Sequence, residues 1–87
     1  MRLKYTFEMM ELDDQLIAIP ISDNTEEFKA VIKLNETAAF LFDLLKNEMT
    51  EMDIVNAVCR EYNVSYERAS IDVHRIIDEF QERGLLV

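Results

Sequence analysis

The chain is poor in the residues that build catalytic loops and metal sites. Its 87 residues include one glycine, one proline, one cysteine and no tryptophan. A single glycine excludes the glycine-rich loops that hold phosphate groups. Cys59 has no partner for an internal disulfide, and together with His74, the only histidine, it falls short of the three or four ligands of a typical zinc site. We therefore expect no bound metal and no cofactor.

Basic residues are also scarce. Nine Lys and Arg stand against 18 Asp and Glu, which gives a net charge of −9. Such a chain repels nucleic-acid backbones and anionic membrane surfaces. No apolar run approaches the roughly 18 residues of a membrane span, and Glu8 interrupts the N-terminus before a signal-peptide core could form. We expect a cytoplasmic protein that binds neither nucleic acid nor membrane.

The remaining composition is that of a globular domain. Hydrophobic residues make up 49% of the chain and charged residues 31%, and there is no internal repeat or low-complexity tract. A chain of this length supports one thin hydrophobic core. We therefore treat residues 1–87 as a single domain.

The first third of the chain is predicted to form three strands. Tyr5–Leu12 and Gln15–Ile21 are apolar-rich segments separated by Asp13-Asp14, which suits a chain reversal. A polar loop over residues 22–27 then leads to Phe28–Leu34, which alternates with period two. Its expected core face is Phe28, Ala30, Ile32 and Leu34, with Lys29, Val31 and Lys33 opposite. Lysines pointing outward are typical of an exposed edge strand.

Three amphipathic helices are expected after the strands, over residues 36–46, 51–62 and 66–83. Their capping residues would be Asn35, Thr50 with Asp53, and Ser65 at the N-termini, and Asn63 and Gly84 at C-termini. The apolar residues at helical spacing are Ala38, Leu41, Phe42 and Leu45; Ile54, Ala57, Val58 and Tyr62; and Ala69, Val73, Ile76, Ile77 and Phe80. The predicted class is α+β, a winged helix-turn-helix-like body with a three-stranded antiparallel sheet followed by three helices.

Five segments carry a likeness to a known family. They are Leu34–Leu45, Thr50–Ile54, Tyr62–Ala69, Asp72-Val73 and Glu82–Leu86. In order and spacing they resemble the PqqD family of RiPP recognition elements, and the likeness extends over nearly the whole chain. One departure is Ala38, where many relatives carry glycine; alanine favours a helix more strongly, so the fold should be unaffected.

The resemblance implies a peptide chaperone without chemistry of its own. Such domains bind the leader region of a ribosomally made precursor peptide and present it to a modifying enzyme, often a radical S-adenosylmethionine (radical SAM) protein, in RiPP or cofactor biosynthesis. The leader adds as a strand beside the third strand, in a groove against the third helix. Carried onto this sequence, the edge comprises Phe28, Lys29, Ala30, Val31, Ile32 and Lys33.

For the helical wall, a helical wheel places Arg68, Asp72, Arg75 and Glu79 along one flank of the core stripe of the third helix, with Ile71 on the outer side beside Arg68 and Arg75. The candidate binding residues of this helix are Arg68, Ile71, Asp72 and Arg75. An outward Ile71 between two arginines would suit an apolar and acidic peptide. A structural interpretation remains open beside this one. Single exposed isoleucines are common, edge lysines protect against aggregation, and the arginines could pair with acids one turn away.

Catalysis has no support in the sequence. His74 lies on a helix flank, Cys59 has no suggested His or Asp partner, and the carboxylates are scattered over polar faces. We predict that the protein is not an enzyme and has no catalytic residues.

Three other functions are kept as alternatives. A DNA-binding winged helix would use the third helix, where five acids outnumber three arginines. A protein–protein adaptor of the same fold would bind no leader. A homodimer could form by exchange or pairing of the edge strand. A further hypothesis places enzyme docking on Phe40 and Leu44, which widen the apolar band of the first helix.

Overall fold

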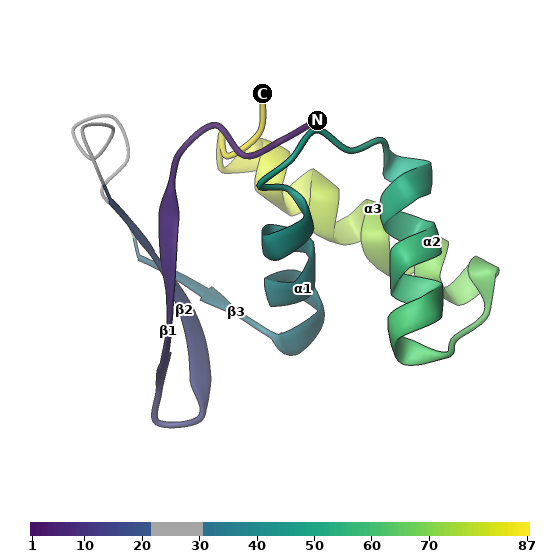
Figure 1. Ribbon diagram of the computed structural model, residues 1–87, viewed down its shortest axis with the longest axis horizontal. Helices are drawn as coiled ribbons and strands as arrows, with labels where there is room; N and C mark the ends of the chain where they lie inside the picture. The colour runs from purple at the N-terminus through teal and green to yellow at the C-terminus, as the bar shows by residue number, and fades with distance from the viewer. Residues whose placement is uncertain (22–30) are drawn as a thin grey trace.

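Strands and helices occupy separate parts of the chain. The computed structural model describes residues 1–21 and 31–87. Its elements are β1 (Phe7–Leu12), β2 (Gln15–Pro20), β3 (Ile32–Leu34), α1 (Glu36–Leu44), α2 (Glu51–Tyr62) and α3 (Tyr66–Glu82). The sheet is antiparallel with strand order β1-β2-β3. It lies at one end of the molecule and α2 at the other, with α1 between them (Figure 1). The predicted α+β class is confirmed.

The hairpin between β1 and β2 closes through two aspartates. Asp13 and Asp14 have φ of 52° and 64°, and Leu12 pairs with Gln15 across the turn. Positive φ at both central positions is the requirement of a type I′ turn, whose twist matches that of the flanking strands. Aspartate reaches this conformation more readily than most residues. The predicted reversal is confirmed.

β3 is shorter than the strand expected over residues 28–34. It covers Ile32–Leu34, and Val31 precedes it. Phe28, Lys29 and Ala30 lie outside the described residues. Where the predicted alternation can be checked it is confirmed, because Ile32 and Leu34 are buried whereas Val31 and Lys33 are exposed.

The helices begin at the predicted caps. Asn35 Oδ1 accepts from the Ala38 N–H at 2.8 Å, and Ser65 Oγ accepts from the Arg68 N–H at 3.2 Å. At α2, Thr50 and Asp53 bond each other's backbone N–H, the full capping box. α1 ends two residues earlier than expected, because the chain tightens into i→i−3 bonds from Lys46 to Asp43 (3.4 Å) and from Asn47 to Leu44 (3.2 Å).

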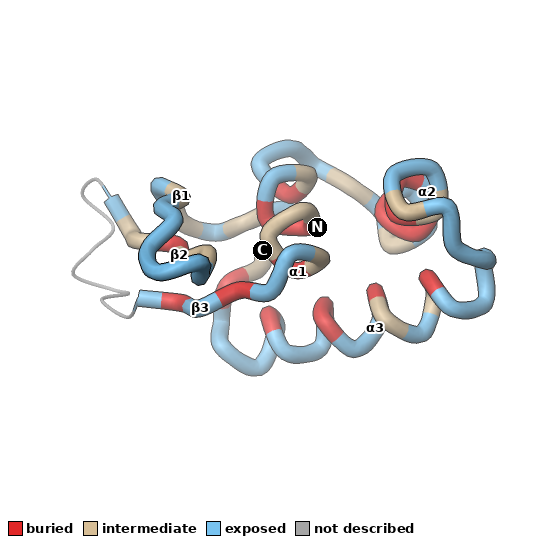
Figure 2. Tube along the Cα trace, turned by 90° about the horizontal axis from the view of Figure 1, so that it is seen from below, coloured by how far each residue is buried: buried red, intermediate tan, exposed pale blue. Residues whose placement is uncertain are grey.

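A single core joins the sheet to the helices. Phe42 of α1 lies at its centre, edge-on to Phe7 of β1 at 5.0 Å and to Phe80 of α3 at 5.2 Å between ring centroids. Figure 2 shows the buried residues of α3 spaced along the side that faces the other elements. The clustered buried residues are Ala18, Ile32, Leu34, Ala38, Leu41, Phe42, Leu45, Ile54, Val55, Val58, Ala69, Val73, Ile76, Ile77, Phe80 and Leu85. The predicted core faces of α1 and α3 are confirmed in full.

Phe40 and Leu44 are half-buried against this core. Phe40 packs edge-on to Tyr62 of α2 at 5.6 Å. Partial burial, with Glu36 and Glu61 nearby, raises the pKa of Tyr62. The wide apolar band of α1 therefore serves contact with α2 as well as with the rest of the core.

The two ends of the chain meet beside α1 (Figure 1). Leu3 and Leu86 form an antiparallel bridge, Lys4 N–H donates to Leu85 O at 2.7 Å, and Val87 N–H donates to Arg2 O at 2.9 Å. Leu85 is fully buried, whereas Val87 is exposed. The C-terminal residues thus return to the body, with Leu85 making the main apolar contact.

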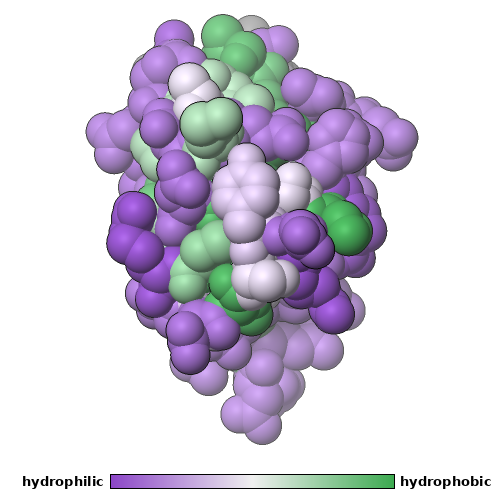
Figure 3. Space-filling view, turned by 90° about the vertical axis from the view of Figure 1, so that its right-hand side faces the viewer, coloured by the Kyte–Doolittle hydropathy of each residue, from purple (hydrophilic) through white to green (hydrophobic). Residues whose placement is uncertain are grey.

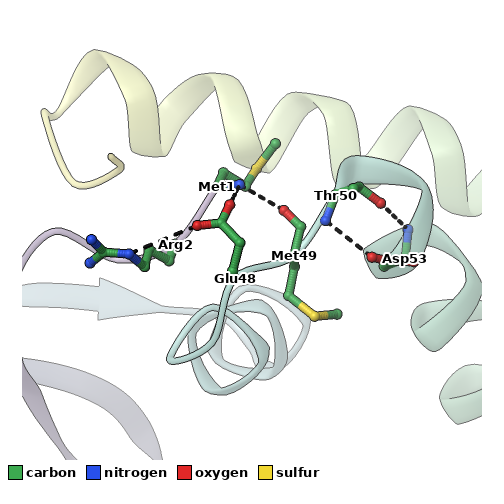
Figure 4. Close-up of polar contacts among 6 residues, drawn as sticks. All are labelled: Met1, Arg2, Glu48, Met49, Thr50 and Asp53. Carbon is green, nitrogen blue, oxygen red and sulfur yellow. Dashed lines mark hydrogen bonds and ion pairs between the residues drawn. The ribbon is translucent and has the colours of Figure 1, made fainter.

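The N-terminal segment also contacts the connection between α1 and α2 (Figure 4). The Met1 ammonium donates to the Glu48 carboxylate and, at 2.8 Å, to Met49 O. Arg2 Nε lies 3.8 Å from the same carboxylate. The hydrogen bond from the ammonium, with help from Arg2, lowers the pKa of Glu48. The residues before β1 are therefore bonded both to the connection between α1 and α2 and to the C-terminal residues.

The end of the molecule formed by α2 and the start of α3 is mainly hydrophilic. Figure 3 shows a narrow band of weakly polar and hydrophobic residues crossing this face between charged ones. The large hydrophobic side chains exposed on these helices and on the turn between them include Met52, Val64 and Tyr66. Across residues 1–21 and 31–87, no helix combines the length and the apolar character needed to cross a membrane.

Candidate functional site

β3 has one paired edge and one edge that no described strand covers. β2 occupies the first, with Ala18 opposite Ile32 and Leu16 opposite Leu34. Hydrogen-bonded and non-bonded pairs alternate in an antiparallel ladder. Between β2 and β1, the Ile21 N–H donates to Thr6 O at 3.0 Å. The backbone N–H and C=O groups of every second residue of β2, counted back from Ile21, therefore point toward β1.

The same alternation determines which way the backbone N–H and C=O groups of β3 point. Leu16 and Ala18 of β2 turn their N–H and C=O groups toward β3, so their partners Leu34 and Ile32 use theirs within the sheet. Lys33, between them, turns its N–H and C=O to the open side. This edge therefore offers a donor and an acceptor to an added strand at Lys33.

A groove lies between this edge and α3. Its lining comes from β3, the start of α1 and the C-terminal half of α3, and consists of Ile32, Lys33, Leu34, Asn35, Ala38, Arg75, Ile76, Glu79, Phe80 and Arg83. Its volume is about 120 Å³. Pockets for drug-sized ligands are typically several hundred Å³. The groove has room for a peptide side chain rather than a cofactor.

The floor of the groove is apolar and its rim is charged. Ile32, Ile76 and Phe80 are each at most 3% exposed, so the floor is also part of the hydrophobic core. Among the residues that the structure describes, the rim carries Lys33, Arg75 and Arg83 against one acid, Glu79. On a chain of net charge −9, this is a locally basic site.

The structure brings together some of the predicted site residues. Ile32, Lys33 and Arg75 line the groove. Val31 adjoins it and is exposed. Phe28, Lys29 and Ala30 lie outside the part of the chain that the structure describes.

The other predicted helix residues do not line the groove. Arg68, Ile71 and Asp72 lie toward the N-terminus of α3, where Ile71 is 66% exposed. Asp72 pairs with Arg68 at 3.3 Å and with Arg75 at 3.6 Å. This pairing links the predicted cluster to the groove through Arg75.

Several groove residues were not predicted as site residues. Ile76 and Phe80 were assigned to the core, and Glu79 and Arg83 follow on the same helical face. Their i, i+3, i+4, i+7 spacing was visible in the sequence. What the spacing could not show is that β3 lies beside the second half of α3 and not the first.

Two larger depressions lie elsewhere on the described residues. One, lined by Ser70, Ile71, His74, Arg75, Asp78, Glu79 and Glu82, involves residues of α3 alone and so has no second wall. Its three acids are unfavourable for contact with nucleic acid. A second, about 470 Å³, lies between the N-terminal segment and α1.

Among residues 1–21 and 31–87, no cluster of His, Cys, Asp and Glu is placed to hold a metal ion. His74 lies 3.3 Å from Glu51 Oε2 and 3.4 Å from Asp78 Oδ2, and its side chain is exposed.

These features define a class of small α+β domain: a three-stranded sheet with an uncovered edge strand beside a helix-lined groove. The family model described as Coenzyme PQQ synthesis protein D (PqqD) matches residues 21–86. The chain therefore belongs to the PqqD family, as the sequence resemblance indicated. No curated protein sequence matches the chain.

Two solved structures share the fold. "TbiB1 in Complex with the TbiA(beta) Leader Peptide" has a TM-score of 0.74 and 19% identity, with 99% of this chain and 94% of that chain covered. "Lasso peptide synthetase B1 complexed with the leader peptide" has a TM-score of 0.68 and 21% identity, with 97% and 93% covered. At these identities, the likeness shows a common fold over nearly the whole of each chain.

Proposed function

We propose that this protein is a non-catalytic peptide chaperone that binds the leader region of a ribosomally synthesised precursor peptide. The observation that carries the proposal is the uncovered edge of β3 above an apolar-floored groove. Membership of the PqqD family supports it, as do the two structurally similar proteins, TbiB1 and lasso peptide synthetase B1, each in complex with a leader peptide.

Binding would occur by β-strand addition. The leader lies beside β3, exchanges main-chain hydrogen bonds with Lys33, and extends the sheet to four strands. Its side chains alternate between the outer face of the sheet and the groove beside α3. Main-chain bonds supply affinity that depends little on sequence, and the groove supplies selectivity.

The peptide site comprises two sets of residues. The edge set is Phe28, Lys29, Ala30, Val31, Ile32 and Lys33, and the helix set is Arg68, Ile71, Asp72 and Arg75, to which the groove adds Ile76, Glu79, Phe80 and Arg83. A leader longer than the groove would reach Arg68 and Ile71 by continuing toward the N-terminus of α3.

The bound leader would then be presented to a modifying enzyme in the cytoplasm, with a radical SAM protein as the proposed partner. The domain would contribute no catalytic group of its own. Holding the leader raises the effective concentration of the attached core peptide at the enzyme by tethering, without any new contact to the core.

Titration calorimetry against the leader region of a precursor encoded beside this gene tests the proposal. We expect saturable one-to-one binding with a negative heat-capacity change, because apolar leader side chains are buried. Absence of binding to that leader, in folded protein, would favour a protein–protein adaptor of the same fold.

The open edge could also pair with a second copy of the chain. Light scattering with and without leader separates the two uses of the edge. If a dimer forms through β3, saturating leader should convert it to a monomer, because both partners need the same Lys33 groups.

A further inference from the structure

The charge of the groove is opposite to that of the protein as a whole. Three of the nine basic residues of the chain, Lys33, Arg75 and Arg83, line one groove of about 120 Å³. Within the described residues, Lys33 and Arg83 form no ion pair, and Arg75 has a single contact, at 3.6 Å to Asp72. Two cations are thus left without an acidic partner.

The nearby acid does not neutralise them. Glu79 lines the same groove but lies beyond ion-pair distance of Lys33, Arg75 and Arg83. Edge protection alone would account for a lysine on β3. It does not account for two arginines on α3 on the other side of the same groove.

We propose that the groove selects an acidic segment, with Asp or Glu side chains at two adjacent positions of the added strand, one on each face of the sheet. The proposal rests on the proposed function and specifies the chemistry of the peptide it accepts. Carboxylates would complete the ion pairs that Lys33 and Arg83 lack, and the apolar floor would take a small or aliphatic side chain on the other side of the acid that faces Lys33.

The register of the added strand assigns these positions. In an antiparallel addition, the peptide residue that exchanges bonds with Lys33 places its side chain beside that of Lys33, on the outer sheet face. The residues before and after it point to the opposite face, toward Arg75, Arg83 and the floor. One acid is therefore expected opposite Lys33, and an acid and an apolar residue on the two neighbouring positions.

The net charge of −9 works against an acidic ligand at long range. At physiological ionic strength, however, interactions between exposed charges are screened beyond about 8 Å. The contacts inside the groove therefore decide the preference, which is opposite to what net charge alone predicts.

The first test selects binders from a displayed library of random 12-residue peptides on the full chain. We expect enriched peptides to carry two adjacent Asp or Glu residues flanked by a small or aliphatic residue, and to be depleted in Lys and Arg. Enriched peptides without excess acid would overturn this inference and leave peptide binding standing. No enrichment over the starting library would count against the proposed function itself.

The second test measures an enriched acidic peptide against charge variants. Lys33→Gln and Arg83→Gln should each weaken binding about two- to fivefold, the range of partly exposed ion pairs. Arg60→Gln is the matched control, because it removes one positive charge from α2, which contributes nothing to the groove. Loss equal to that of Arg60→Gln would contradict the inference.

A variant that binds the peptide more tightly provides a further test, because unfolding cannot explain an increase in affinity. Glu79→Gln removes the one acid among the described residues that line the groove, and should tighten binding of the acidic peptide about two- to fivefold. Glu82→Gln, on the same helix but outside the groove, should change it less. Equal effects of the two variants would show that net charge, and not the groove, determines affinity.

Discussion

Individual residues in this chain are matched to the backbone conformations they occupy. Asn63 ends α2 with φ 52° and ψ 48°, and Gly84 follows α3 with φ 72°. Both are left-handed conformations that asparagine and glycine adopt with little strain. Asp13 and Asp14 suit their conformations less well, because Asn-Gly is the preferred residue pair in the type I′ turn that they form.

The hairpin turn is therefore open to improvement. Replacing Asp14 by Gly at φ 64° should stabilise the domain by about 0.5–1 kcal/mol, since glycine occupies that region without steric cost. Urea denaturation would measure the change. Asp14→Ala, which removes the same charge but keeps a Cβ, serves as the control and should stabilise less or destabilise.

The capping box of α2 supports a second prediction at this scale. Thr50→Ala removes the acceptor at 3.1 Å from the Asp53 N–H and should cost about 1 kcal/mol. Thr50→Ser keeps the hydroxyl and should cost much less. Similar losses in thermal or urea unfolding for the two variants would show that the methyl group matters more than the hydrogen bond.

At the scale of elements, β3 combines a structural edge with a binding edge. Its Ile32 and Leu34 bond β2 and fill the core, whereas the backbone of Lys33 faces outward. The two roles alternate along three residues, so they can be separated by mutation.

Lys33→Pro should abolish most leader binding, by more than tenfold, while the domain stays folded. Proline removes an N–H that bonds nothing in the sheet but that an added strand needs. Lys33→Ala, which keeps the N–H, is the matched control in calorimetry, with circular dichroism as the check on folding. Ile32→Pro should instead unfold the domain, because it breaks the ladder and empties a core position. Equal binding by the proline and alanine variants would rule out strand addition at Lys33.

At the scale of the whole molecule, both ends of the chain complete the core. Leu85 is fully buried, and its carbonyl accepts from the Lys4 N–H. Leu85→Ala should therefore destabilise by about 2–4 kcal/mol, the cost of an aliphatic cavity. Val87→Ala, at an exposed position, should change stability by less than about 0.5 kcal/mol in the same denaturation assay. A small effect of Leu85→Ala would show that the tail frays from the body.

The sequence by itself determined the local structure of this protein. Each helix start predicted from a cap residue was found at that residue, because a cap bonds N–H groups two or three positions away and needs no distant partner. The core faces of α1 and α3 followed from helical periodicity in the same way. Element ends were less well predicted, as at the last turn of α1, where i→i−3 bonds replace the α-helical ladder.

Only the tertiary structure decided where the groove lies. The sequence indicated an edge strand and an outward face of α3, but the predicted wall over Arg68–Arg75 and the observed groove share only Arg75. Which half of a 17-residue helix borders a three-residue strand depends on contacts between residues some 40 positions apart. Periodicity repeats along a helix and so identifies a face, whereas packing against the rest of the chain fixes the position along it.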